Sequence, residues 1–179
     1  LAHVKALYDD EIHWVDRHIG KVLDKLRELK LEENTIVVFL GDHGDEFFEH
    51  ASIGHCSTLY SELTHIPMMM MGPGIPVGKR VNQTVRIFDL APTVVDLTGV
   101  TPLQRMEGRS LTKAWSENPP PRPGALSRVY VPHSDKPFNI REAWRNHRFS
   151  VLRAFRSTPT EGLLEPHFYA KIKSPFLVF

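Results

Sequence analysis

The chain has 179 residues, of which 41% are apolar and 24% charged, and its formal net charge is +1 at pH 7. This is the composition of an ordinary globular protein that is long enough to bury a core. The near-zero net charge excludes the strong electrostatic attraction to nucleic acid that a basic protein has, and no apolar run is long enough to cross a bilayer.

The first expected element is a long amphipathic helix over residues 3–30. Its apolar residues recur at helical spacing, and its acidic residues precede its basic ones, as the helix dipole favours. Residues 31–34 then form a turn into the apolar run 36–40, which predicts a strand buried on both faces because no polar residue alternates within it. A helix, a loop and a strand in this order are typical of a parallel α/β sheet.

Acidic and imidazole side chains gather directly after this strand. Gly41 breaks the apolar run, and the cluster follows at what should be the carboxyl end of the strand, the edge where open α/β sheets bind ligands. The pattern predicts a metal site or an acid/base site. Its seven members are Asp42, His43, Asp45, Glu46, Glu49, His50 and His55.

Shorter elements are expected between this cluster and residue 111. Asp89 is suited to the N-cap of one of them, a short helix, and Gly99 to its C-terminal end. In chain order the elements are a short helix at 59–63, a second buried strand at 66–71, a Gly/Pro-rich loop at 72–78, a third short strand at 79–86, the helix at 88–97 and a loop at 101–111.

A proline-rich segment divides the chain near its middle. We expect a first domain over 1–117, a linker or loop over 118–126 and a small C-terminal subdomain over 127–179. Within that subdomain, 127–131 and 149–155 predict strands of an antiparallel element, while 141–148 fits a helical turn or the edge of a hairpin. Residues 159–179 carry little periodic signal.

Ten short motifs in the first domain, taken in order, resemble the later half of the catalytic domain of a sulfatase, in the alkaline-phosphatase-like superfamily. The Asp-His-Gly motif alone is weak evidence, but the ordered set is specific and covers residues 8–111. The motifs are Tyr8-Asp9-x-Glu11-Ile12-x-x-Val15-Asp16-x-x-Ile19-Gly20, Glu33-Asn34-Thr35, Gly41-Asp42-His43-Gly44, Glu49-His50, Gly54-His55, Leu59-Tyr60-x-Glu62-Leu63, His65-Ile66-Pro67, Gly72-Pro73-Gly74, Asp89-Leu90-Ala91-Pro92-Thr93 and Gly108-Arg109-Ser110-Leu111.

The resemblance implies a fold class, and it also implies that the chain is a fragment of a longer protein. The fold would be part of a mixed, mostly parallel α/β sheet flanked by helices, followed by the small antiparallel element. Sulfatases use a cysteine in a Cys-x-Pro-Ser-Arg motif, converted to formylglycine, and no such motif occurs here; Cys56 is followed by Ser57-Thr58 and does not match. We therefore expect a fragment whose formylglycine nucleophile lies upstream, and no sulfatase activity from this chain alone.

The resemblance also assigns roles to three residues. Asp42 and His43 match the pair that helps to hold a divalent cation, usually Ca²⁺. Because Ca²⁺ prefers oxygen donors, the imidazole of His43 is a weaker fit and leaves Mg²⁺ or Mn²⁺ as possible ions. His55 falls where sulfatases place a Lys or His near the ester oxygen, so it is expected to assist departure of the alcohol. The other acidic residues of the cluster are expected to be solvated, and Asp89 to cap its helix and brace the adjoining loop.

The leading functional hypothesis is hydrolysis of sulfuric esters, with a sulfated carbohydrate or an aryl sulfate as substrate. Three alternatives stay open. The chain could be part of a phosphonate monoester hydrolase or phosphodiesterase, or of a phosphoethanolamine transferase, both in the same superfamily. It could also be an inactive truncated fragment. Neither nucleic acid nor a membrane-spanning segment is expected.

Overall fold

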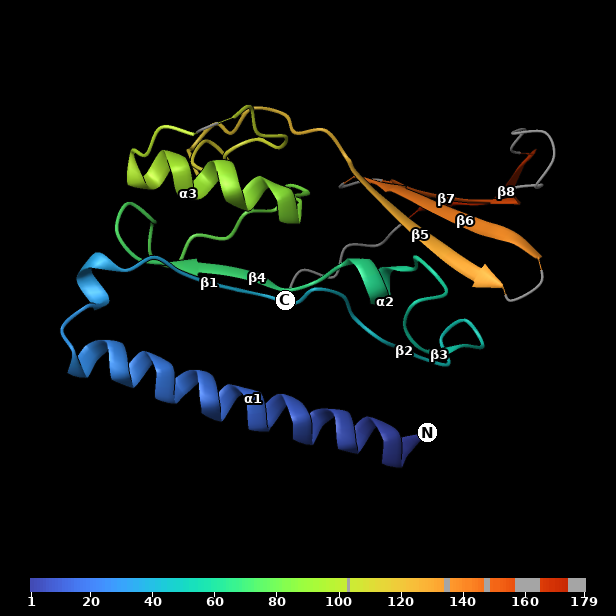
Figure 1. Ribbon diagram of the computed structural model, residues 1–179, viewed down its shortest axis with the longest axis horizontal. Coiled ribbons are helices and arrows are strands. Elements are labelled where there is room, and N and C mark those ends of the chain that lie inside the picture. Colours follow the sequence, from blue (N-terminus) through green and yellow to red (C-terminus); the bar gives the residue numbers. More distant parts are fainter. Residues whose placement is uncertain (103, 134–135, 147–148, 157–164, 174–179) are drawn as a thin grey trace.

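The computed structural model describes residues 1–102, 104–133, 136–146, 149–156 and 165–173 (Figure 1). Two layers of helix lie on opposite sides of a central strand pair, and a separate four-stranded sheet follows at the C-terminal side (Figure 1). In chain order the elements are α1 Ala2–Glu28, η1 Glu32–Asn34, β1 Val37–Leu40, β2 Glu46–Phe47, β3 Ile53–Gly54, α2 Ser61–Thr64, β4 Met68–Met71, η2 Ile87–Asp89, α3 Leu90–Thr98, β5 Ala125–His133, β6 Lys136–Arg145, β7 Phe149–Arg156 and β8 Glu165–Lys173.

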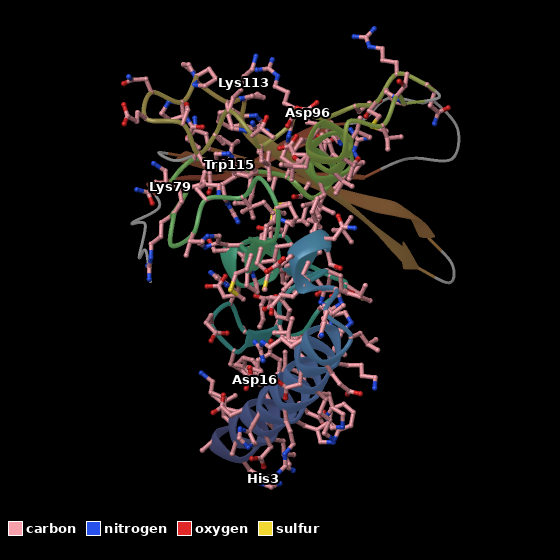
Figure 2. All side chains as sticks on the ribbon, turned by 90° about the vertical axis from the view of Figure 1, so that its left-hand side faces the viewer. His3, Asp16, Lys79, Asp96, Lys113 and Trp115 are labelled. Atoms are coloured by element: carbon pink, nitrogen blue, oxygen red, sulfur yellow. The ribbon has the colours of Figure 1, made fainter. Side chains whose placement is uncertain are left out.

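Helix α1 confirms the long helix predicted from the apolar spacing. It buries none of its residues, and apolar side chains such as Leu7, Ile12 and Val22 are 52%, 54% and 61% exposed. The described part of the chain therefore leaves the apolar face of α1 uncovered. Figure 2 shows His3 and Asp16 of this helix at one end of the molecule, with Asp96 and Lys113 at the other. Within the described ranges, no helix combines the length and apolarity needed to span a membrane.

The central strand pair is β1 and β4, which are antiparallel, with Val37 opposite Met71 and Leu40 opposite Met68. The expected burial of both strands on both faces is wrong for the described chain. β1 is only half-buried throughout, and β4 alternates between half-buried and exposed positions. Within the described residues, no side chain of α1 is buried against these strands.

Three other expectations can be scored here. The short helices at 59–63 and 88–97 are confirmed as α2 and α3, and α3 ends at Gly99 in the left-handed conformation, with φ of 68°. The third strand expected at 79–86 is wrong: that segment pairs with no strand in the described structure. Its Gln83 instead donates from Nε2 to the Pro120 carbonyl at 3.1 Å, so it packs against the proline-rich segment as an irregular loop.

The C-terminal residues form one antiparallel sheet in the order β5-β6-β7-β8. Strands at 127–131 and 149–155 are confirmed within β5 and β7. Residues 141–145, expected as a helical turn or the edge of a hairpin, instead belong to β6, an inner strand that pairs with both β5 and β7. β8 was not predicted; the remaining residues of 157–179, which the sequence left without an expectation, lie outside the described ranges.

Arginines of β6 join this sheet to the segment that follows the predicted site. Arg145 donates to the Thr64 hydroxyl and, at 3.4 Å, to the Leu59 carbonyl, and Arg141 donates to the Ser57 carbonyl. Burial lowers the pKa of the Arg145 guanidinium, and the nearby Glu62 carboxylate opposes that effect. The sheet thus supports the back of α2, whose Leu63 is one of the few fully buried apolar residues.

Candidate active site

The predicted site lies where β1 ends. The Gly41 N–H donates to the Pro67 carbonyl at 3.1 Å, which extends the contact between β1 and β4 by one step. Three residues later the Gly44 N–H donates to the Leu63 carbonyl of α2 at 3.0 Å. The Asp-His turn between these two glycines is therefore fixed at both ends, at the strand edge where the sequence predicted a ligand site.

The third residue of the Asp-His-Gly motif must be glycine because α2 approaches it closely. A Cβ at Gly44 would lie 1.9 Å from the Glu62 carbonyl oxygen and 3.0 Å from its carbon. Those are backbone atoms, so the clash can be relieved only by moving α2 or the turn.

Replacing Gly44 with alanine should therefore lower the free energy of unfolding by about 1–3 kcal/mol, the usual cost of overpacking. Urea denaturation measures this. The control is Gly20→Ala on α1, where nothing lies within 4 Å and the greater helix propensity of alanine should stabilise. Equal stability of the two variants would contradict the close approach of α2.

Asp42 presents its carboxylate to solvent, with a side chain that is 91% exposed. Its Oδ1 accepts the His43 backbone N–H at 3.0 Å. This backbone hydrogen bond, with smaller contributions from its own amide and from the charge of His43, holds the pKa of the Asp42 carboxyl below its usual range. The carboxylate is consequently ionised at neutral pH and available to a cation.

His43 is held in one orientation by its backbone. Its Nδ1 lies 3.0 Å from the Gly44 carbonyl oxygen, which can only accept, so Nδ1 carries the proton. In the neutral ring, Nε2 then has a free lone pair, and it lies 3.8 Å from Asp42 Oδ2. Metal–ligand bonds of roughly 2.0 to 2.6 Å allow two atoms at this separation to bind the same ion.

His55 follows β3 and lies beside His43, although it is twelve positions later in the chain. The ring centroids of His43 and His55 are 4.0 Å apart and their planes are tilted by 37°. Nδ1 of His55 lies 2.8 Å from Asp45 Oδ1, and since a carboxylate only accepts, Nδ1 of His55 donates. The structure thus brings all three sequence-predicted site residues to one place.

Asp45 also belongs to this site, and the sequence did not predict its place there. It was expected to be solvated, but its side chain is 24% exposed and is bonded to His55. His43, Asp45 and His55 each offer one donor atom within 4.8 Å of the others, a set that could also hold a metal ion. His43 therefore has two possible partners in metal binding, Asp42 and the Asp45–His55 pair.

Glu46 and His50 bond to each other and to residues that follow β3. Glu46 is completely buried and accepts from the Thr58 hydroxyl and from His50 Nδ1, the latter at 3.2 Å. The His50 ring stacks on Tyr60 with 3.5 Å between centroids. The expectation that Glu46 is solvated is wrong: its carboxylate is paired inside the loop that connects β2 to α2.

Comparison with protein families matches residues 2–100 to the sulfatase model. This chain belongs to the sulfatase family. Arylsulfatase K from Canis lupus familiaris is 35% identical over 117 residues, which are 65% of this chain and 22% of that protein. Arylsulfatase K from Danio rerio is 33% identical over 158 residues, 88% of this chain and 27% of that protein. This sulfatase chain therefore spans about a fifth to a quarter of these relatives.

Solved structures place this sulfatase chain in the predicted fold class. A 2-O GAG sulfatase matches with a TM-score of 0.70 at 26% identity, over 87% of this chain and 33% of that one. The phosphonate monoester hydrolase from Silicibacter pomeroyi matches equally well, with a TM-score of 0.70 at 25% identity, over 87% and 32%. The α/β, alkaline-phosphatase-like fold is confirmed, although the strand pairs that the described residues contribute are antiparallel.

Cys56 is exposed and has a φ of 77°, a left-handed conformation that is unusual for a residue with a side chain. It directly follows His55 in this sulfatase chain, and Gly54 on the other side is also left-handed, with φ of 79°. Two residues in the left-handed conformation therefore flank His55.

Asp89 lies in a different part of this sulfatase chain, in a network that fixes the loop at 107–111. It is completely buried, with Arg86 and Arg122 each 2.8 Å from its carboxylate and the Arg109 amide donating at 2.9 Å. Burial alone would raise the pKa of Asp89, but the hydrogen bonds from Arg86, Arg109 and Arg122 outweigh it and hold that pKa below its usual range. Asp89 braces the loop, as the sequence predicted. It also stands at the N-cap position of α3, but its side chain makes no capping hydrogen bond there.

Proposed function

We propose that these residues form one wall of the active site of a divalent-cation-dependent sulfatase that hydrolyses sulfuric esters. The observation that carries the proposal is the arrangement around the end of β1. There the ionised Asp42 carboxylate and Nε2 of His43 lie 3.8 Å apart, with the His55 ring against His43. Two ligand atoms for a cation, next to a side chain that can donate a proton, suit the cleavage of a charged ester.

Asp42 Oδ2 and His43 Nε2 would hold the cation. When bound, the cation offsets the negative charge of the ester oxygens. Ca²⁺ is our first candidate because of the family, and the imidazole donor makes Mn²⁺ or Mg²⁺ the alternatives to test. The Gly44 carbonyl, by accepting from Nδ1–H of His43, would leave Nε2 as the ring nitrogen available to a cation.

His55 would act on the leaving group. In its protonated form, Nδ1–H remains bonded to Asp45, so Nε2–H is the proton available to the ester. As the S–O bond to the alcohol breaks, Nε2 gives this proton to the departing oxygen, which leaves as the neutral alcohol. The nucleophile, a formylglycine hydrate in this proposal, comes from sequence upstream of these 179 residues, and the chain alone is expected to be inactive.

The substrate we propose is a sulfated carbohydrate. Support comes from a third structural neighbour, solved in complex with its substrate D-glucosamine-2-N,6-O-disulfate, which matches with a TM-score of 0.61 at 25% identity over 86% of this chain and 31% of that one. The second candidate is hydrolysis of phosphonate monoesters. It is favoured by the equally good structural match to the hydrolase from Silicibacter pomeroyi.

Rates on matched substrates separate these two functions. The longer polypeptide that carries this segment and its predicted nucleophile is assayed on an aryl sulfate, a sulfated monosaccharide and an aryl phosphonate monoester. A sulfatase should give a kcat/KM at least about 100-fold higher on a sulfate ester than on the phosphonate, a difference of about 2.7 kcal/mol in transition-state binding. Preference for the phosphonate would overturn the sulfatase assignment.

Substituting His55 should mainly slow the hydrolysis of substrates that have poor leaving groups. His55→Ala is expected to lower kcat by about 100-fold or more on an alkyl or sugar sulfate, the usual scale of general acid catalysis, and much less on a nitrophenyl sulfate, whose phenolate needs no proton. The control is His18→Ala, on the exposed surface of α1, which should change neither rate. A His55→Ala effect of equal size on both substrates would contradict the acid role.

A further inference from the structure

The Asp45–His55 pair is built into the hairpin that β2 and β3 form. Glu46 lies opposite Gly54 and Phe47 opposite Ile53 in the antiparallel register. The next position outward in the same register places Asp45 opposite His55. Side chains directly opposite each other on antiparallel strands are near neighbours, and here the Asp45 Oδ1 to His55 Nδ1 distance is 2.8 Å.

The buried Glu46 fixes this register. It is completely buried and accepts from the Thr58 hydroxyl and from His50, so the strand that carries it cannot slide without leaving a buried carboxylate unpaired. A slip by one residue would also turn Asp45 to the other face of the hairpin. The pairing of Asp45 with His55 is therefore held by interactions outside the pair.

An imidazole requires such a partner more than an ammonium group does. A lysine presents one charged nitrogen from a flexible stem, whereas a histidine has two distinct nitrogens and must have the correct one protonated and directed outward. A carboxylate on Nδ1 sets both the tautomer and the ring orientation. The tilted His43 ring, 4.0 Å away, limits rotation of His55 from one face.

We propose that Asp45 is a positioning residue that holds His55 with Nε2 directed at the substrate, and that Asp45 is not a ligand of the cation. The inference rests on the role proposed above for His55. It explains why Asp45 lies within ligand distance of His43 and His55: its Oδ1 is engaged by Nδ1–H of His55, whereas the Asp42 carboxylate, 91% exposed, is free for the ion.

The protonation of the His55 ring tests the pairing without any assay of activity. The longer polypeptide that carries this segment is labelled with ¹⁵N-histidine, and long-range ¹H–¹⁵N spectra are recorded at pH 8 with a chelator present. The proposal predicts that Nδ1 of His55 carries the proton in the wild type and in the control Asp96→Ala, an exposed carboxylate on α3. In Asp45→Ala the ring should become a mixture of tautomers.

Two spectra would overturn the pairing. One is a wild-type spectrum with the proton on Nε2, which needs no variant to fold. The other is a folded Asp45→Ala chain whose His55 signals match those of the wild type.

Kinetics and cation binding in the longer polypeptide test the consequence. Asp45→Ala should lower kcat on a sugar sulfate by about 10- to 100-fold, as removal of an orienting partner of a functional histidine commonly does, with little change in KM. In a His55→Ala background the same substitution should cost less than about 2-fold, because the residue it positions is already absent.

The dissociation constant of the cation should stay within about 2-fold in Asp45→Ala. Asp45→Ala losses that are equal in both backgrounds, or a cation affinity that falls 10-fold or more, would overturn the proposal and make Asp45 an independent residue or a ligand. Failure of His55→Ala to change kcat would instead contradict the proposed function. The tautomer spectra decide the Asp45–His55 pairing separately.

Discussion

Asp42→Ala should weaken binding of the divalent cation by about 100-fold or more and lower kcat/KM on a sulfate ester by at least about 10³-fold, since a catalytic cation supplies several kcal/mol of transition-state stabilisation. The reason lies in the exposed carboxylate, whose pKa the His43 amide holds below its usual range and which is 3.8 Å from the free nitrogen of His43. Isothermal titration with Ca²⁺ and with Mn²⁺ measures the affinity, and hydrolysis of a sugar sulfate measures the rate.

Two comparisons make this result specific. Asp10→Ala, an exposed carboxylate on α1, should leave both affinity and rate unchanged. Asp45→Ala should leave the affinity for the cation unchanged. If the affinity survives in Asp42→Ala and is lost in Asp45→Ala, the ion is held by His43, Asp45 and His55, and Asp42 is an ordinary surface residue.

Asp89→Ala should be the most damaging substitution for stability, with a loss of about 3–5 kcal/mol in the free energy of unfolding. It would leave the buried Arg86 and Arg122 guanidiniums, with side chains 16% and 6% exposed, without their shared carboxylate. The Arg109 amide would lose its acceptor as well. Urea denaturation of the longer polypeptide measures this, and Asp96→Ala, at an exposed position of α3, should change stability by less than about 0.5 kcal/mol.

The Asp89 carboxylate also makes the free energy of unfolding depend on pH in the acid range. The folded-state pKa of Asp89 is lower than its unfolded value of about 3.9, so the unfolded state takes up a proton first as the pH falls. The contribution of Asp89 is therefore complete above about pH 5 and is lost as the pH falls through the folded-state pKa. Asp89→Asn should lack this component; an unchanged acid profile in that variant would show that other carboxylates cause the acid unfolding.

Local pattern and motif order predicted much of this molecule. The helical spacing of apolar residues located α1, and the run after Asn34 located β1, since both signals arise within one element. The glycines that end elements were also readable: Gly99 ends α3 and Gly41 ends the extended run. Asp42, His43 and His55 were predicted from their places in the motif series, and the structure brings them together.

What the sequence did not predict depends on pairing between distant segments. Asp45 and His55 meet because of the β2–β3 register, and two residues per strand are too few for a periodic signal. Burial of Glu46 depends on His50 and Thr58, which no spacing rule connects to it. β1 and β4 are only partly buried in the described structure. An apolar run predicts that a strand is buried, but it does not show which segment buries it.

The central claim is that this segment contributes the cation-binding wall of a sulfatase. The most direct measurement is the rate of hydrolysis of a sulfated monosaccharide by the longer polypeptide, first after removal of divalent cations with a chelator and then after Ca²⁺ is added back. We predict that activity is lost and then restored, and that Asp42→Ala is not restored at the same Ca²⁺ concentration. Full activity in the chelator, or restoration of Asp42→Ala to the wild-type rate, would contradict the account.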